Sequence, residues 1–210
     1  MTYVGIDVSK ATFVVAYSSA KNSKTKTFKN TTKGVHEFIQ TLSANEHHCV
    51  LEATGNYSSL LVYLLSRANI TVSLENPLKI KNFARVMLSV TKTDETDARL
   101  IALYGERMQP APYKLRSDAI LTLKQKRTVI RQLKKQLIAT QNLKGSMEAL
   151  PFFDPKCKKA IEKTIVFLEK QTKGLEEELA ALAQSEYKKQ IDLLTSIKGI
   201  GVTLAAVSYT

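Results

Sequence analysis

The chain has 210 residues, of which 44% are hydrophobic, and its 31 Lys and Arg against 19 Asp and Glu give a net charge of +12. That apolar content excludes a disordered chain, and the length suits one ordinary domain with a sizeable appendage or two small domains. The basic balance predicts a polyanionic partner such as nucleic acid, with a generally soluble basic surface as the alternative.

The first half of the chain alternates short β-prone runs with helical patterns. The β-prone runs cover residues 3–8, 12–17 and 24–28, and the tight connections between them suggest an antiparallel meander. The remaining elements follow in chain order: a helix over 32–42, a strand over 49–52, a helix over 57–68, a strand over 70–74 ended by the turn Asn76-Pro77, and helices over about 78–88 and 94–108. Three strands that lead into crossover units predict an α/β sheet.

Beyond Pro110 and Pro112, which mark a boundary, the pattern changes to long helices. Mostly apolar residues step alternately by four and three from Ile161 to Glu186, which is the spacing of a coiled-coil seam. Because residues 151–155 contain two prolines that interrupt a helix, we predict an antiparallel hairpin of helices over about 117–147 and 157–190. A hairpin of this length exposes its seam unless it meets a partner, which favours oligomerisation.

The basic excess is concentrated in the predicted hairpin, since residues 111–170 carry +9, against +4 in residues 1–110 and −1 in residues 171–210. We expect phosphate contacts from the first hairpin helix. The candidate residues are Lys124, Lys126, Arg127, Arg131, Lys134 and Lys135. Further on, the turn around Gly199 and Gly201 could hold a phosphate or simply join two helices.

No segment approaches the ~20 apolar residues that a membrane span needs, and we expect no membrane partner. Asp7 falls where a signal peptide needs its apolar stretch. Cys49 and Cys157 each stand alone in the sequence, which supports neither a disulfide framework nor a structural zinc site. We therefore expect a cytoplasmic protein.

Two acidic residues end apolar β-prone runs. Asp7 follows Gly5 and Ile6, and Glu52 follows Leu51 and precedes a predicted helix. Acids are disfavoured inside strands and costly to bury alone, and active sites of open α/β sheets gather at the carboxyl ends of strands. The alternative for both residues is a solvated acid at the end of a strand.

Asp94 and Asp97 are three residues apart and therefore lie on one face of a predicted helix that starts near Lys92 and Thr93. Acids in a first turn can simply cap the helix and complement its dipole. Two acids on one face repel each other unless a cation lies between them, which favours a metal site. Phosphodiester chemistry with Mg²⁺ needs such converging carboxylates, and Glu95 is expected to face solvent.

Three strings, in this order, resemble the DEDD transposases, an insertion-sequence family of bridge-RNA-guided DNA recombinases related to the Piv-type DNA invertases. The strings are Gly5-Ile6-Asp7-Val8-Ser9-Lys10, Leu51-Glu52-Ala53-Thr54-Gly55-Asn56-Tyr57 and Lys92-Thr93-Asp94-Glu95-Thr96-Asp97-Ala98. The resemblance covers the whole chain. It implies a ribonuclease H-like, RuvC-like fold over residues 1–110, a basic coiled-coil hairpin over 111–192, and the start of a C-terminal transposase domain over 193–210.

The resemblance also implies the chemistry of the site. Asp7, Glu52, Asp94 and Asp97 would form a catalytic tetrad that binds Mg²⁺, with Mn²⁺ as a substitute, and Lys10 and Asn56 would touch the scissile phosphate. The implied partners are DNA, a guide RNA and further copies of the chain, as a homodimer or tetramer, in the bacterial cytoplasm. Family members carry a serine nucleophile in their C-terminal domain, and we expect this chain to stop before it, since neither Ser196 nor Ser208 has a suitable context.

Three other functions remain open from the sequence. A RuvC-like structure-specific endonuclease would use the same four acids with water as the nucleophile. A non-catalytic module would bind RNA and DNA and oligomerise without any metal. A sugar-kinase-like ATPase shares the opening fold, but no second Gly-rich phosphate loop follows a strand here.

Overall fold

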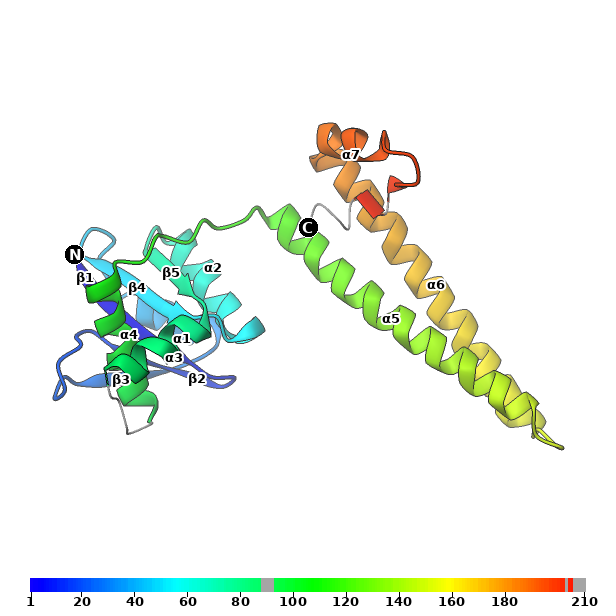
Figure 1. The fold of residues 1–210 in the computed structure, drawn as a ribbon, viewed down its shortest axis with the longest axis horizontal. Coiled ribbons are helices and arrows are strands. Elements are labelled where there is room, and N and C mark those ends of the chain that lie inside the picture. The colour runs from blue at the N-terminus through cyan, green and yellow to red at the C-terminus, as the bar shows by residue number, and fades with distance from the viewer. Residues whose placement is uncertain (88–92, 203, 206–210) are drawn as a thin grey trace. The chain divides into compact units, whose positions relative to one another are not determined.

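A computed structural model describes residues 1–87, 93–202 and 204–205 of the chain. These residues form two compact units, Met1–Leu115 and Arg116–Thr210. The first unit is a sheet flanked by helices, and the second consists of helices alone (Figure 1). The predicted three-part division, in which residues 193–210 open a further domain, stays a prediction.

A five-stranded mixed sheet forms the centre of the first unit. Its strands are β1 (Thr2–Val8), β2 (Thr12–Ala16), β3 (Thr25–Lys29), β4 (His47–Glu52) and β5 (Thr71–Glu75). They lie in the order β3-β2-β1-β4-β5, with β1 to β3 antiparallel as predicted, and with β4 and β5 parallel to β1. This mixed sheet with flanking helices confirms the predicted ribonuclease H-like α/β fold.

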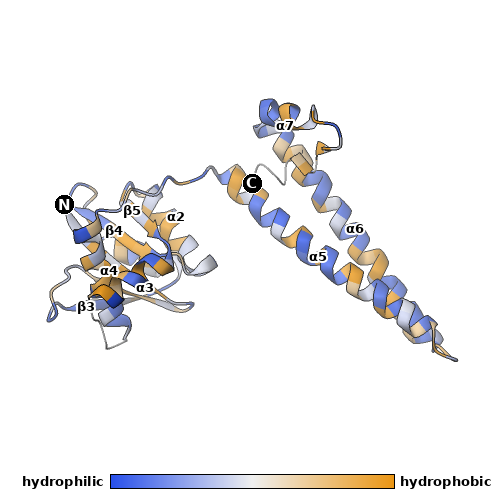
Figure 2. Cartoon of the chain, viewed as in Figure 1, coloured by the Kyte–Doolittle hydropathy of each residue, from blue (hydrophilic) through white to orange (hydrophobic). Residues whose placement is uncertain are grey.

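Helices cover both faces of the sheet. Helices α1 (Thr32–Ile39) and α2 (Ser59–Arg67) bury one face, through side chains such as Phe38 and Leu61 packed on Ile6. Helices α3 (Pro77–Val86) and α4 (Asp94–Met108) cover the other face, where Val50 packs with Ile80 and Ile101. Strand β4, which lies inside the sheet, is largely hydrophobic, as Figure 2 shows. Successive residues of each strand therefore point to opposite faces of the sheet.

Several element boundaries differ from the sequence-based prediction. Helix α1 ends at Ile39 rather than Leu42, and a 3₁₀ helix, η1 (Gly55–Ser58), precedes α2. Strand β5 runs to Glu75 rather than ending at Leu74. The predicted turn at residues 76–77 is the start of α3, because the Asn76 side chain accepts a hydrogen bond from Leu78 N at 2.8 Å. Leu88 and Lys92, which the predictions included in or beside helices, lie outside the described residues.

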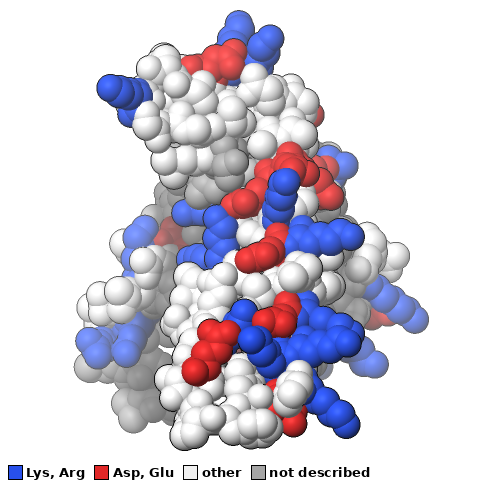
Figure 3. Space-filling model, turned by 90° about the vertical axis from the view of Figure 1, so that its right-hand side faces the viewer, with Lys and Arg blue, Asp and Glu red and all other residues white. Residues whose placement is uncertain are grey.

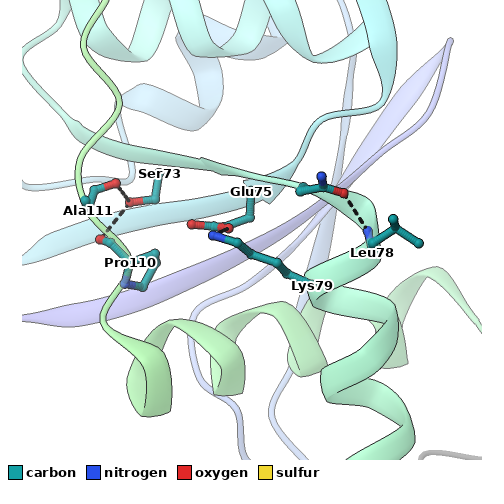
Figure 4. A network of polar contacts seen from close by, with 7 residues as sticks. Ser73, Glu75, Leu78, Lys79, Pro110 and Ala111 are labelled. Carbon is teal, nitrogen blue, oxygen red and sulfur yellow. Dashed lines mark hydrogen bonds and ion pairs between the residues drawn. The ribbon is translucent and has the colours of Figure 1, made fainter.

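The segment after α4 is fastened to the edge of the sheet. The Ser73 hydroxyl lies 2.8 Å from the carbonyl oxygen of Ala111, 3.0 Å from that of Pro110 and 2.7 Å from His48 Nε2 (Figure 4). Since the single hydroxyl proton of Ser73 goes to a carbonyl, its oxygen accepts from His48 Nε2–H. Burial lowers the pKa of His48, which keeps the ring neutral. The segment at Pro110, where the sequence predicted a boundary, is therefore bound to strand β5 through Ser73.

The second unit is a helical hairpin with a short third helix. Its helices are α5 (Asp118–Glu148), α6 (Pro155–Glu186) and α7 (Lys188–Thr195). Helix α6 begins two residues earlier than predicted, because Pro155 takes the first helical position and the Asp154 carboxylate caps Lys156 N at 3.0 Å and Cys157 N at 2.9 Å. It also ends at Glu186 rather than near residue 190.

The seam predicted for α6 is partly covered by α5 within the hairpin, which corrects the expectation that a hairpin of this length exposes its seam unless it meets a partner. Leu168, Thr172 and Leu179 are buried, whereas Val166 and Phe167 are exposed. Ion pairs between Lys134 and Glu176 (2.6 Å) and between Lys144 and Glu162 (3.1 Å) cross from α5 to α6. None of the described helices is long and apolar enough to cross a membrane.

Candidate metal centre

Asp7 and Glu52 lie at the carboxyl ends of neighbouring parallel strands. The register pairs Ile6 of β1 with Leu51 of β4. Asp7 and Glu52 are each one residue further along, so both project from the same face of the sheet. Both are partly exposed. This is the face that α3 and α4 cover, since Val50, two residues before Glu52, packs there.

The absence of a side chain at Gly5 lets α4 lie directly on β1. A Cβ atom at this position would stand 2.0 Å from the carbonyl oxygen of Ala98 and 2.2 Å from the backbone nitrogen of Ala102, both in α4. These are backbone atoms in the middle of a helix, so no side-chain rotation could relieve the clash. Helix and strand therefore approach at backbone contact distance, and α4 is placed with little freedom.

This approach fixes which end of α4 meets Asp7. A Cβ at Gly105, later in the helix, would meet the Tyr3 ring at 2.8 Å. Moving along β1 from Tyr3 toward Asp7 therefore means moving back along α4 toward its first turn. That turn carries Asp94 and Asp97, which thus come to the end of the strand that holds Asp7.

Thr93 caps α4, so neither aspartate serves as its N-cap. The Thr93 hydroxyl accepts a hydrogen bond from Thr96 N at 3.2 Å, and the Thr96 hydroxyl accepts one from Thr93 N at 2.9 Å. This reciprocal pair is a capping box. The alternative in which Asp94 or Asp97 serves as the cap is therefore not what the helix uses, although both acids still lie in its first turn.

Burial and the charges of the other three acids all act on the pKa of Asp7. Burial, followed by the charges of Asp94, Asp97 and Glu52, raises the pKa of Asp7 from 3.8 to about 6. A backbone hydrogen bond with Val8 opposes the shift only in part. Residues from β1, β4 and α4 thus act on one carboxyl group, as mutual repulsion between neighbouring carboxylates requires.

The four carboxylates are chemically suitable ligands for a hard divalent cation, but their side chains do not converge on one point in this structure. Among the described residues, no group of three or more His, Cys, Asp or Glu is close enough to hold a metal ion. The electrostatic coupling and this separation are compatible, because like charges turn away from each other until a cation lies between them. Four carboxylates are ligands of the kind that Mg²⁺ prefers.

Lys10 and Asn56 lie on turns that one side chain ties together. Lys10 is exposed in the turn after β1, and Asn56 is exposed in η1. The Asn30 side-chain amide donates to the carbonyl oxygen of Ser9 at 3.0 Å and to that of Tyr57 at 2.9 Å. It therefore joins the neighbours of Lys10 and Asn56, a link that no local pattern of the sequence reveals.

Two residues near the carboxyl ends of the parallel strands, Glu75 of β5 and Lys79 of α3, were not predicted from the sequence. Glu75 is paired in register with Glu52 and is only 8% exposed, and its carboxylate accepts from Lys79 Nζ at 2.9 Å. The signal that could have found it is the alternation of residues 71–75, in which Glu75 shares the face of Ser73. Because the predicted strand ended at Leu74, this alternation was cut one residue short.

The six basic candidates of α5 divide into two groups. Lys126 forms an ion pair with Glu178, and Lys134 forms one with Glu176, so both side chains are directed toward α6. The others recur at intervals of three or four residues and lie on one side of the helix. This α5 stripe consists of Lys124, Arg127, Arg131 and Lys135.

The α5 stripe concentrates positive charge. Burial, followed by the charges of Arg116 and Arg127, lowers the pKa of Lys124. Arg127, Arg131 and Lys135 are exposed. Lys and Arg side chains cover much of the charged surface seen in Figure 3, with acidic side chains set between them. Crowded cations of this kind favour an anionic partner.

The mixed sheet with its flanking helices defines the class of the first unit as a ribonuclease H-like α/β domain, with acids at the carboxyl ends of its parallel strands. A family model described as a transposase, of the DEDD type found in IS110 elements, matches residues 4–147. The match covers more than half of the chain, which therefore belongs to this transposase family. The family match confirms the resemblance drawn from the three sequence strings.

Two relatives are pilin gene-inverting proteins from Moraxella bovis and Moraxella lacunata. Each is 33% identical to the chain over 144 residues, which are 64% of this chain and 45% of the relative. The chain thus matches less than half the length of these relatives.

Proposed function

We propose that the chain is the metal-binding and assembly part of a DNA transposase or site-specific recombinase. Asp7, Glu52, Asp94 and Asp97 would hold Mg²⁺, with Mn²⁺ as a substitute, and the bound metal would stabilise charge on the scissile phosphate. The observation that supports this best is the geometry that brings Glu52 and the first turn of α4 to the end of β1, where burial and the charges of the other acids raise the pKa of Asp7. Lys10 and Asn56 would contact the phosphate from the turns that Asn30 joins.

We assign no nucleophile to the described residues. The Ser196 hydroxyl donates to the carbonyl oxygen of Leu193 at 2.7 Å, beside the end of α7. Ser208 lies outside the described residues. Under this proposal the attacking group of the reaction is a serine of the C-terminal domain that the family resemblance implies. The pilin gene inversion named for the two relatives suggests inversion or insertion of a DNA segment.

A metal titration tests the proposal. Mn²⁺ at about 100 times its dissociation constant is expected to stabilise the wild-type chain by about 2.7 kcal/mol. Asp97→Asn should lose this stabilisation, measured as the shift in thermal unfolding. Glu95→Gln removes one charge from the same helical turn, at an exposed position, and should retain it. Equal stabilisation of all three proteins would overturn the metal-binding proposal.

Two other activities give different results in parallel assays. A structure-specific endonuclease would cut branched DNA with Mg²⁺ and this chain alone, whereas the proposed recombinase part should not. A purely binding module would show no carboxylate-dependent Mn²⁺ binding at all. The gathering of Asp7 with three other acids, whose charges together with burial raise its pKa, favours a metal site over that module, because acids weaken the binding of a polyanion.

The α5 stripe would hold the backbone of DNA and of a structured guide RNA. Its charges contact phosphates without reading sequence, which base pairing with the guide would supply. The logarithm of the binding constant K falls as the logarithm of the salt concentration rises. Replacing both Arg127 and Arg131 with Gln is expected to make this negative slope shallower by about 2, measured by fluorescence anisotropy with labelled DNA and RNA. The same change at Lys188 and Lys189, exposed in α7, should leave the slope unchanged. A wild-type slope in the arginine variant would remove the stripe from the binding surface.

We also propose that the hairpin joins copies of the chain into a homodimer or tetramer. Since the seam of α6 is partly covered by α5, the contact would use the outer face of α6. There Val166 and Phe167 are 64% and 59% exposed. Lys159, Lys163 and Lys170 line the shallow groove that these apolar side chains share. Light scattering over a range of protein concentrations tests this association.

A further inference from the structure

The row of acids at the edge of the sheet extends to a third strand. Asp7, Glu52 and Glu75 end the adjacent parallel strands β1, β4 and β5, and all three project from the face covered by α3 and α4. Neighbouring strands lie about 4.8 Å apart. Glu75 is therefore one strand spacing from Glu52 and two from Asp7.

Glu75 forms an ion pair and a hydrogen bond with residues of α3 and α4. Lys79 Nζ lies 2.9 Å from its carboxylate, and the Tyr104 hydroxyl also forms a hydrogen bond with it. The charges that raise the pKa of Asp7 are those of Asp94, Asp97 and Glu52, so Glu75 stands apart from that set. We therefore do not assign Glu75 as a metal ligand.

The ion pair gives Lys79 a defined place. Glu75 is 8% exposed and is held by Tyr104, which is 5% exposed, whereas the Lys79 side chain is 63% exposed. Figure 4 shows the Lys79 side chain reaching from α3 to Glu75 at the end of β5. An exposed ion pair adds little stability, so the main consequence is orientation. The ammonium group has three N–H donors, which leaves donors beyond the one directed to Glu75.

We propose that Lys79 is a phosphate-binding residue, which contacts the backbone of the DNA strand lying across the row of acids. This inference rests on the proposed function, because it assumes that Asp7 and Glu52 face a phosphodiester. A positive charge one strand beyond the carboxylates would hold a phosphate next to the scissile one, where the acids alone would repel it. Lys contacts phosphate as a point charge and reads no sequence.

The test measures binding of the 210-residue chain to labelled duplex DNA as a function of salt. Lys79→Ala is expected to make the negative slope of log K against log salt concentration shallower by about 0.9, the value for one lost phosphate contact. Lys79→Arg should keep the wild-type slope. Lys33→Ala removes the same charge from α1, on the opposite face of the sheet, and should also keep it.

A double variant separates the lost contact from any damage to the fold. Lys79→Ala combined with Glu75→Gln removes the ion pair as a whole, so no buried carboxylate loses its partner and the net charge stays at +12. The same loss of slope is expected, with Mn²⁺ stabilisation retained in every variant. Wild-type slopes in Lys79→Ala and in the double variant, with normal Mn²⁺ binding, would overturn this inference alone. Failure of the wild-type chain to bind Mn²⁺ would instead overturn the proposed function, and the inference with it.

Discussion

Asp7→Asn is expected to make the metal-free protein more stable while abolishing its response to Mn²⁺. Asparagine keeps the size of the side chain but cannot ionise, so it removes both the cost of burying a charge and the repulsion from Asp94, Asp97 and Glu52. The gain at neutral pH should be about 1–2 kcal/mol, once solvent screening of this partly exposed group is allowed for. Chemical unfolding in EDTA measures the gain, and thermal unfolding with Mn²⁺ measures the loss of binding.

The gain depends on pH in a defined direction. The pKa of Asp7 is about 6 in the folded state, against an ordinary value of 3.8. Between these values the folded chain keeps a proton that the unfolded chain releases, so the stability of the wild-type protein falls as pH rises through this window. Below pH 3.8 the variant has no advantage from this source, and above pH 6 it has the full advantage.

Glu37→Gln is the control for the Asp7 substitution, because it removes an exposed acid from α1. Its effect on the free energy of unfolding should stay within about 0.5 kcal/mol, and its response to Mn²⁺ should equal that of the wild type. A metal-free Asp7→Asn protein that is less stable than the wild type at neutral pH would contradict the account of four repelling acids.

Gly5→Ala is expected to destabilise the first unit by about 3 kcal/mol or more and to abolish Mn²⁺ binding as well. The added methyl group would lie 2.0 Å from the carbonyl oxygen of Ala98, so α4 must shift away from β1. The shift separates Asp94 and Asp97 from Asp7. Urea unfolding followed by circular dichroism measures the loss, and Mn²⁺ titration of the folded fraction measures the metal site.

Gly145→Ala provides a control of opposite sign. Gly145 lies inside α5, and a Cβ atom there would meet nothing within 4 Å. Alanine has the higher helix propensity, so this variant should be more stable by about 0.5–1 kcal/mol. If Gly5→Ala instead unfolds like the wild type, α4 does not rest on β1 as the structure has it.

The two substitutions test two different requirements of the metal site, its charge and the placement of its residues. Asp7→Asn changes the charge of the site and leaves its placement intact, whereas Gly5→Ala changes the placement and leaves all four acids in the chain. A metal site assembled from separate elements should fail in both cases, but only the second failure should be accompanied by a loss of stability. The opposite signs of the two stability changes therefore distinguish repulsion among the acids from the packing that brings them together.

Much of the fold could be predicted from the sequence, because local chemistry determines it. Short β-prone runs, the spacing of apolar residues and the prolines at 151 and 155 gave the order of elements, the mixed sheet and the helical hairpin. The acids at the ends of the apolar runs identified Asp7 and Glu52 as candidates, since burying a lone carboxylate is costly. These features depend on residues close together in the chain, which is what a sequence pattern records.

Only the tertiary structure decided which distant groups meet. The contact of Gly5 with Ala98, the register of Glu52 with Glu75 and the partial covering of the α6 seam by α5 join residues far apart in the chain. No periodicity encodes such pairs, because they follow from how strands align and how closely helices approach. A one-residue error at the end of β5 was enough to hide Glu75 and Lys79, since alternation assigns each residue to a face and only the register assigns it a neighbour.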